Sequence, residues 1–232
     1  MKSLIAGMRA VWPIVLAYAP VSAVFGALAV HMHEPLLIAV LISALVYAGS
    51  AQFMLLSMAL AHNPIWTTIG TVLLVNMRHL FYGMTLKDRL TQWTPGEKAL
   101  FAFGLTDEVY LWGMVSARTT TFAYWIGASW ACYLGWVGAT AAGAWEGKGL
   151  PASWTGPLQL TLPLLFLGLL LTTGRSRAQL WAAFGGGAWA ALASLSHAAP
   201  LAIFVGAIGG ATLGWGTDRL AVRKERPEQG HV

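Results

Sequence analysis

Long apolar stretches follow one another along the chain, separated by short polar segments. A helix that crosses a membrane needs roughly 20 predominantly apolar residues, and windows of about that length recur throughout. They cover residues 9–30, 36–60, 65–86, 99–116, 122–144, 157–173, 178–195 and 201–215. The pattern predicts an all-α, polytopic integral membrane helical bundle with about seven or eight transmembrane segments.

The composition leads to the same class. Of 232 residues, 57% are hydrophobic and 10% charged, whereas soluble domains carry roughly 25% charged residues. The net charge of +5 is concentrated at chain ends and loops, as expected for cytoplasmic positive charges, and does not indicate nucleic-acid binding. We expect a single transmembrane domain over residues 1–222, a charged C-terminal tail over 223–232, and contact with the lipid bilayer.

Several predicted helices contain residues that interrupt a helix. Prolines and a glycine in the first window predict a kink, and small residues predict breaks in the second and seventh windows. These are Pro13, Pro20 and Gly26, then Gly49 and Ser50, then Gly185, Gly186 and Gly187. Broken or re-entrant helices hold substrates in transporters, although small residues also simply allow close helix packing. A weak similarity between residues 20–26 and 163–174 would fit an inverted repeat.

Two charged pairs lie inside apolar windows: Arg78-His79 and Asp107-Glu108. A charge near the bilayer centre costs at least roughly 2.5–3.5 kcal/mol and usually marks a transport path. Two structural alternatives remain. Arg78 could lie near a helix end and extend to the headgroups, or the charges could form a salt bridge with no role in transport.

The charged pairs suggest how transport could be coupled to protons. Arg78 or His79 would pair with Asp107 or Glu108, so that one carboxylate is structural and the other binds a proton. His79 could also carry a proton, given its intrinsic titration range. On a continuous helix, Asn76, His79 and Gly83 would share one face, with Arg78 and Tyr82 on the neighbouring face.

The second window offers polar groups at membrane depth. Tyr47, Ser50 and Gln52 carry hydroxyl and amide groups that could bind the ammonium or carboxylate of an amino acid. The alternative is hydrogen bonding between helices.

Enzymatic and metal-dependent functions find little support. The chain has no GxxxxGK[ST], HExxH or GxSxG motif. The stretch His31-Met32-His33-Glu34 lacks a second ligand group nearby, so we expect no metal site and no cofactor.

Four segments resemble the AzlC family, the large subunit of two-component branched-chain amino acid exporters. They are Pro20 with Phe25-Gly26-Ala27-Leu28-Ala29, residues 43–53 around Tyr47-Ala48-Gly49-Ser50-Ala51-Gln52, residues 74–83 around Asn76-Met77-Arg78-His79, and Leu105-Thr106-Asp107-Glu108-Val109-Tyr110. Order and spacing agree over roughly the first half. From Phe122 onward the resemblance lies mainly in hydropathy.

The resemblance implies export of branched-chain amino acids, and of methionine in some members, driven by the proton-motive force. It also implies a small hydrophobic AzlD-type partner subunit and a multi-pass location in the bacterial cytoplasmic (inner) membrane. The candidate substrate-binding or proton-coupling residues are Tyr47, Gly49, Ser50, Gln52, Asn76, Arg78, His79, Thr106, Asp107 and Glu108. The alternatives are an exporter subunit for another small amphiphilic or amino-acid-like solute, or an assembly subunit that does not transport.

Overall fold

The computed structural model describes residues 2–60, 62–115, 121–149, 151–154, 156–157, 160, 164, 167, 176–195 and 202–225. All the regular elements in these residues are helices, which confirms the predicted fold class for that part of the chain. The backbone forms two compact units, Met1–Leu162 and Pro163–Val232, each described here by itself. Among the described helices, α2 (Trp12–His31) is long and apolar enough to cross a membrane by length and composition. The number of spans stays a prediction.

Three predicted windows of the first unit each contain two helices instead of one. The first window, 9–30, corresponds to α2, which α1 (Lys2–Ala10) precedes, and the second holds α3 (Leu36–Val46) and α4 (Gly49–Leu60). The third holds α5 (Ile65–Asn76) and α6 (Arg78–Leu86), followed by the 3₁₀ helix η1 (Lys87–Leu90). The fourth holds α7 (Pro95–Phe103) and α8 (Asp107–Val115).

Local backbone geometry explains where these helices end. Tyr47 ends α3 with φ 40°, a left-handed conformation that cannot continue a right-handed helix. Gly49 and Ser50, where the break was predicted, instead begin α4. At Met77 the hydrogen bonds shorten to three-residue spacing, from Met77 N to Leu74 O (3.1 Å) and from Leu80 N to Met77 O (3.0 Å). Asn76 therefore lies on α5, and the predicted continuous face from Asn76 to Gly83 is wrong.

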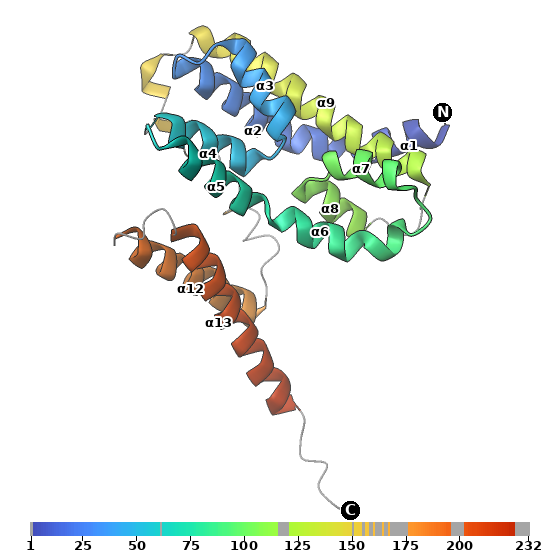
Figure 1. The fold of residues 1–232 in the computed structure, drawn as a ribbon, viewed down its shortest axis with the longest axis vertical. Helices are drawn as coiled ribbons and strands as arrows, with labels where there is room; N and C mark the ends of the chain where they lie inside the picture. Colours follow the sequence, from blue (N-terminus) through green and yellow to red (C-terminus); the bar gives the residue numbers. More distant parts are fainter. Residues whose placement is uncertain are drawn as a thin grey trace, which may run out of the picture. The chain divides into compact units, whose positions relative to one another are not determined.

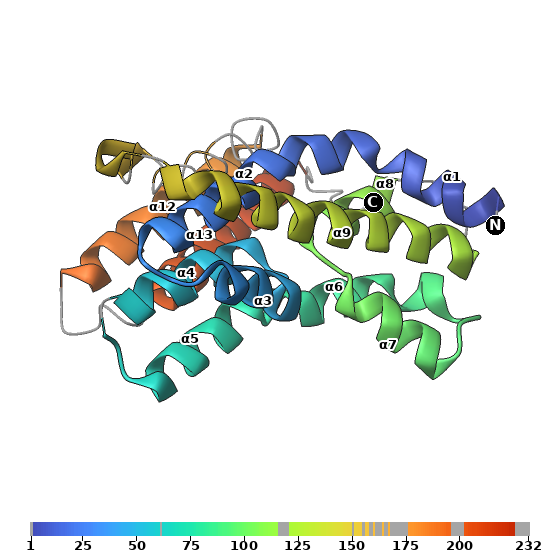
Figure 2. The ribbon, with the colours of Figure 1, turned by 90° about the horizontal axis from the view of Figure 1, so that it is seen from above.

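Helix α9 (Phe122–Glu146) is uninterrupted and packs along α1, α2 and α3 (Figures 1 and 2). Its contact with α2 is very close, because a Cβ on Gly143 would overlap the backbone of Ala23. Such direct contact between helix backbones is typical of membrane helices with small residues at their interfaces. Two short 3₁₀ helices follow, η2 (Gly147–Gly149) and η3 (Ala152–Trp154).

The second unit contains α12 (Arg177–Ser194) and α13 (Ala202–Glu225), which lie side by side (Figure 1). The break predicted at Gly185–Gly187 is wrong, since α12 runs through it. Gly186 serves packing instead: a Cβ on Gly210 of α13 would lie 3.0 Å from the Cα of Gly186.

Two other expectations concern residues near the end of the chain. Most of the predicted window 157–173 lies outside the described residues, so the inverted repeat stays a prediction. Helix α13 continues beyond residue 222 to Glu225 and so includes the first residues of the predicted tail. The single transmembrane domain over 1–222 also stays a prediction.

Candidate functional site

The break between α3 and α4 meets the break between α7 and α8. The ring of Tyr47, at the end of α3, stacks on Phe103, at the end of α7, with centroids 6.4 Å apart and planes inclined by 28°. Tyr47 also packs edge-on against Tyr133 of α9, at 4.9 Å. Tyr47 is buried, 5% exposed. A residue predicted for the site thus lies where two broken helices touch.

Helix α9 satisfies backbone groups at both breaks. Ser129 Oγ donates to the carbonyl of Gly104, just after α7 (2.9 Å), and Tyr133 OH donates to the carbonyl of Ala44 in α3 (3.1 Å). Helix ends leave carbonyls without an intrahelical partner, and a bilayer supplies no water to replace it. The two donors are four residues apart and share one face of α9. That face of α9 therefore supplies the hydrogen-bond donors for carbonyl groups at both breaks.

Removing these hydroxyl donors should destabilise the protein without leaving a large cavity in its core. We expect Ser129→Ala and Tyr133→Phe each to lower stability by about 1–3 kcal/mol, since each leaves a carbonyl unsatisfied. The measurement is the melting temperature of the purified protein in detergent. Tyr124→Phe is the matched control, because its hydroxyl makes no hydrogen bond to a described residue. Equal melting temperatures for all three variants would contradict the capping role.

An ion pair joins the starts of three helices. Arg78 Nη1 lies 2.7 Å from Asp107 Oδ2, and Arg78 Nη2 donates to Ser50 Oγ at 2.9 Å. Tyr82 OH donates to the other carboxylate oxygen, Asp107 Oδ1, at 2.5 Å. Ser50, Arg78 and Asp107 lie in the first turns of α4, α6 and α8. Asp107 is also favoured there by the positive end of the α8 dipole.

His79 lies beside this network without joining it. Its Nδ1 is 3.0 Å from the carbonyl oxygen of Asn76, and its ring packs edge-on against Tyr82 at 5.5 Å. Tyr82 stacks in turn on Tyr110 of α8, with centroids 4.3 Å apart. Of the four charge pairs that the sequence left open, the described residues contain the one between Arg78 and Asp107.

Glu108 occupies a different environment from its neighbour Asp107. Successive helical residues differ by about 100° in direction, so Glu108 turns away from the ion pair. It interacts electrostatically with Tyr47, which follows α3, and with Tyr18 of α2. Within the described residues, Glu108 forms no ion pair. The two adjacent carboxylates are therefore not equivalent.

Gln52 lies on α4, two residues after Ser50. Its side chain is fully buried, and its Oε1 accepts a hydrogen bond from Trp136 Nε1 at 2.9 Å. Trp136 also lies over Gly49, where an added Cβ would be 2.9 Å from the indole ring. Three buried polar atoms have no partner among the described residues: Gln52 Nε2, Asn76 Oδ1 and Arg78 Nε. Such atoms are rare in native structures and call for a ligand, an ion or water.

The sequence did not point to a buried hydroxyl cluster that joins α2, α3 and α9. Thr140 Oγ1 lies 2.7 Å from both Ser22 Oγ and Ser43 Oγ, and Ser22 also donates to the carbonyl of Trp136. All three hydroxyl residues are fully buried. One signal was available: Ser129, Tyr133, Trp136 and Thr140 recur at helical spacing along one face of a window read only for its hydropathy.

Helices with buried charges and paired breaks are features of integral membrane proteins. The family model described as "AzlC protein" matches residues 13–150, which include α2 to α9. The chain therefore belongs to the AzlC family.

Two relatives agree with this assignment. The chain is 34% identical over 169 residues to "Inner membrane protein YgaZ" of Escherichia coli (strain K12), covering 69% of each chain. It is also 34% identical over 207 residues to an "Uncharacterized membrane protein" of Archaeoglobus fulgidus, covering 88% of this chain and 91% of the relative. No solved structure matches. The chain is a membrane protein.

Proposed function

We propose that this chain is the large subunit of a secondary active transporter that exports branched-chain amino acids, and methionine, using the proton-motive force. It acts without an enzymatic step in the bacterial cytoplasmic (inner) membrane, as a multi-pass protein. Its partner is a small hydrophobic subunit of the AzlD type. The observation that carries the proposal is the Arg78–Asp107 ion pair, built with Ser50 and Tyr82 at the starts of broken helices.

The unpartnered polar atoms support an amino acid as the substrate. Gln52 Nε2 and Arg78 Nε are donors that suit a carboxylate, and Asn76 Oδ1 is an acceptor that suits an ammonium group. Tyr47, between two breaks, supplies a buried aromatic wall. Transporters bind substrates at such discontinuous helices. An aliphatic amino acid carries the carboxylate, the ammonium group and the apolar side chain that these residues suit.

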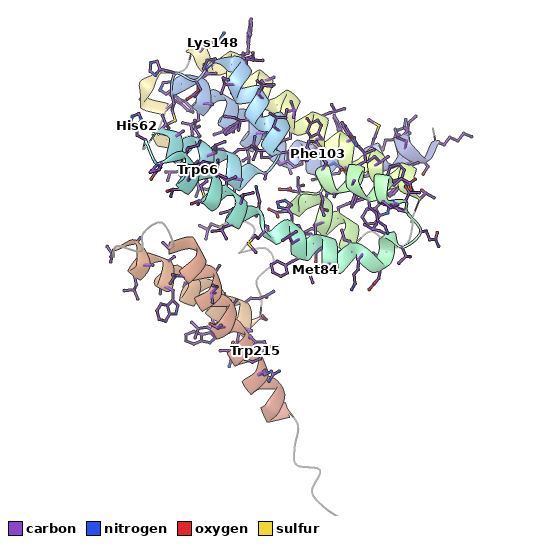
Figure 3. The ribbon with its side chains drawn as sticks, viewed as in Figure 1. His62, Trp66, Met84, Phe103, Lys148 and Trp215 are labelled. Carbon is purple, nitrogen blue, oxygen red and sulfur yellow. The ribbon has the colours of Figure 1, made fainter. Side chains whose placement is uncertain are left out.

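Efflux from cells tests the proposal. Cells that express the chain with a candidate small subunit are loaded with leucine, isoleucine, valine or methionine, and release is followed with and without the proton gradient. We expect efflux that requires the gradient and the small subunit, and that falls to background in Gln52→Ala. Met84→Leu is the control, because Met84 is 64% exposed on α6 (Figure 3).

Two results would count against the proposal. Efflux that persists when the gradient is collapsed would remove proton coupling. No efflux of any of the four amino acids, with both subunits shown to be inserted, would favour another solute or an assembly role.

A further inference from the structure

We propose that Glu108 is the residue that binds the coupling proton, while its neighbour Asp107 stays ionised as the structural partner of Arg78. This inference rests on the proposed function and deepens it, because the resemblance and the sequence leave Asp107, Glu108 and His79 equally open. The geometry of the two carboxylates distinguishes them.

The carboxylate of Asp107 is fully engaged. One oxygen pairs with Arg78 at 2.7 Å, and the other accepts from Tyr82 at 2.5 Å. A proton on either oxygen would compete with one of these donors and would remove the charge that Arg78 faces. Loss of that charge would leave an arginine without its ion pair inside the membrane, which is costly. Asp107 is therefore suited to remain ionised throughout a transport cycle.

Glu108 can accommodate both protonation states. Its carboxylate forms no hydrogen bond and no ion pair with a described residue, so a proton on it displaces no donor and leaves no cation unpaired. Among the described residues, the titratable groups that interact electrostatically with Glu108 lie on four helices and at the residue that follows α3, and one of them is a cation. They are Tyr18 of α2, Tyr47 after α3, Arg78 and Tyr82 of α6, Asp107 of α8 and Cys132 of α9. Arg78 is already paired with Asp107.

Glu108 also lies next to the break between α7 and α8, so its protonation can affect that break. Thr106 lies between α7 and α8, and its Oγ1 accepts from the backbone N–H of Val109 at 3.4 Å, at the start of α8. Tyr47, which interacts with Glu108, ends α3. A change in the charge of Glu108 thus acts on both breaks. The carboxylate takes a proton from water on one side of the membrane and returns it to water on the other, so no further reactant is needed.

His79 fits this role less well. Its Nδ1 lies against the carbonyl of Asn76 and its ring against Tyr82, so it has no hydrogen bond to either carboxylate. It also follows Arg78 directly, whose positive charge opposes a second one on the adjacent residue.

The experiment uses the complete complex, chain and small subunit together, in proteoliposomes. Infrared difference spectroscopy across a pH titration follows the C=O band of protonated carboxyl groups, and leucine uptake is measured both as gradient-driven transport and as counterflow. In Glu108→Gln we expect the titrating band to disappear, gradient-driven transport to fall to background, and counterflow to continue independently of pH. In Asp107→Asn we expect the band to persist and both transport modes to fall together.

Several results would overturn the inference: a titrating band that survives in Glu108→Gln, a band lost in Asp107→Asn instead, or proton-driven transport by Glu108→Gln at the wild-type level. Glu108→Asp provides a second test if Glu108→Gln does not insert. It keeps a carboxyl group at residue 108 on a side chain shorter by one methylene, so the band should persist but shift in frequency, and an unshifted band would count against Glu108. A wild-type complex that moves none of leucine, isoleucine, valine and methionine counts against the proposed function, but the infrared result still decides on Glu108.

Discussion

Gly143→Leu is expected to prevent the first unit from folding. Any side chain at residue 143 would overlap the backbone of Ala23 in α2, and a backbone cannot move aside as a flexible side chain can. Overpacking of a close-packed interior costs about 1–3 kcal/mol where the surroundings adjust. Here α2 and α9 would have to separate, so we expect a loss of stability at or above the upper end of that range. The measurement is the fraction of monodisperse protein after extraction into detergent, with the melting temperature of what remains.

The same helix provides a matched control. A Cβ on Gly138 would meet nothing within 4 Å. Gly138→Leu makes an identical chemical change five residues from Gly143 in the same helix, and we expect wild-type yield and stability. Equal losses from both substitutions would show that α9 tolerates no leucine anywhere, and that the close contact with α2 is not the cause.

Arg78→Ala is expected to abolish transport and to weaken the fold. It leaves Asp107 without its cation and Ser50 without its donor, so that the starts of α4, α6 and α8 lose their common contact. The side chains of Arg78 and Asp107 are 27% and 26% exposed, so the cost should lie below that of a fully buried pair. We expect about 1.5–3 kcal/mol, the range for hydrogen bonds to charged groups. Efflux and melting temperature are measured on the same preparations.

Two further variants show whether charge or geometry matters. Arg78→Lys keeps the charge but cannot hold Ser50 and Asp107 with separate nitrogens of one planar group, so we expect it to retain part of the stability and little transport. Lys87→Ala removes an exposed cation at the end of α6 and should change neither property. Normal efflux from Arg78→Ala would exclude this ion pair from the transport mechanism.

The sequence was most informative where a residue conflicts with its surroundings. Charges in apolar windows drew attention to Arg78 and Asp107, and the structure joins them. The second window was expected to break at Gly49 and Ser50, and α3 ends just before them, at Tyr47. In both cases a local cost, of a buried charge or a difficult backbone conformation, can be recognised without knowing what lies opposite.

Features that depend on a distant partner could not be predicted in the same way. The carbonyls that accept from Ser129 and Tyr133 belong to Gly104, which follows α7, and to Ala44 in α3. No local sequence pattern predicts that side chains of α9 contact them. Glycines show the same difficulty. Gly185–Gly187 look like a break in isolation, yet α12 continues through them because α13 packs against Gly186. Whether a glycine interrupts a helix or admits a neighbour is decided by tertiary structure.

The face of α9 that carries Ser129, Tyr133, Trp136 and Thr140 also limits how this protein can evolve. Each of these side chains has its own partner, on another helix or, for Ser129, at the residue that follows α7. One inserted or deleted residue between Ser129 and Thr140 would rotate one end of the face by about 100° relative to the other and disconnect half of these contacts. Substitutions on the outer side of α9 leave the face intact. Homologous chains should therefore vary in sequence along this stretch while keeping its length unchanged.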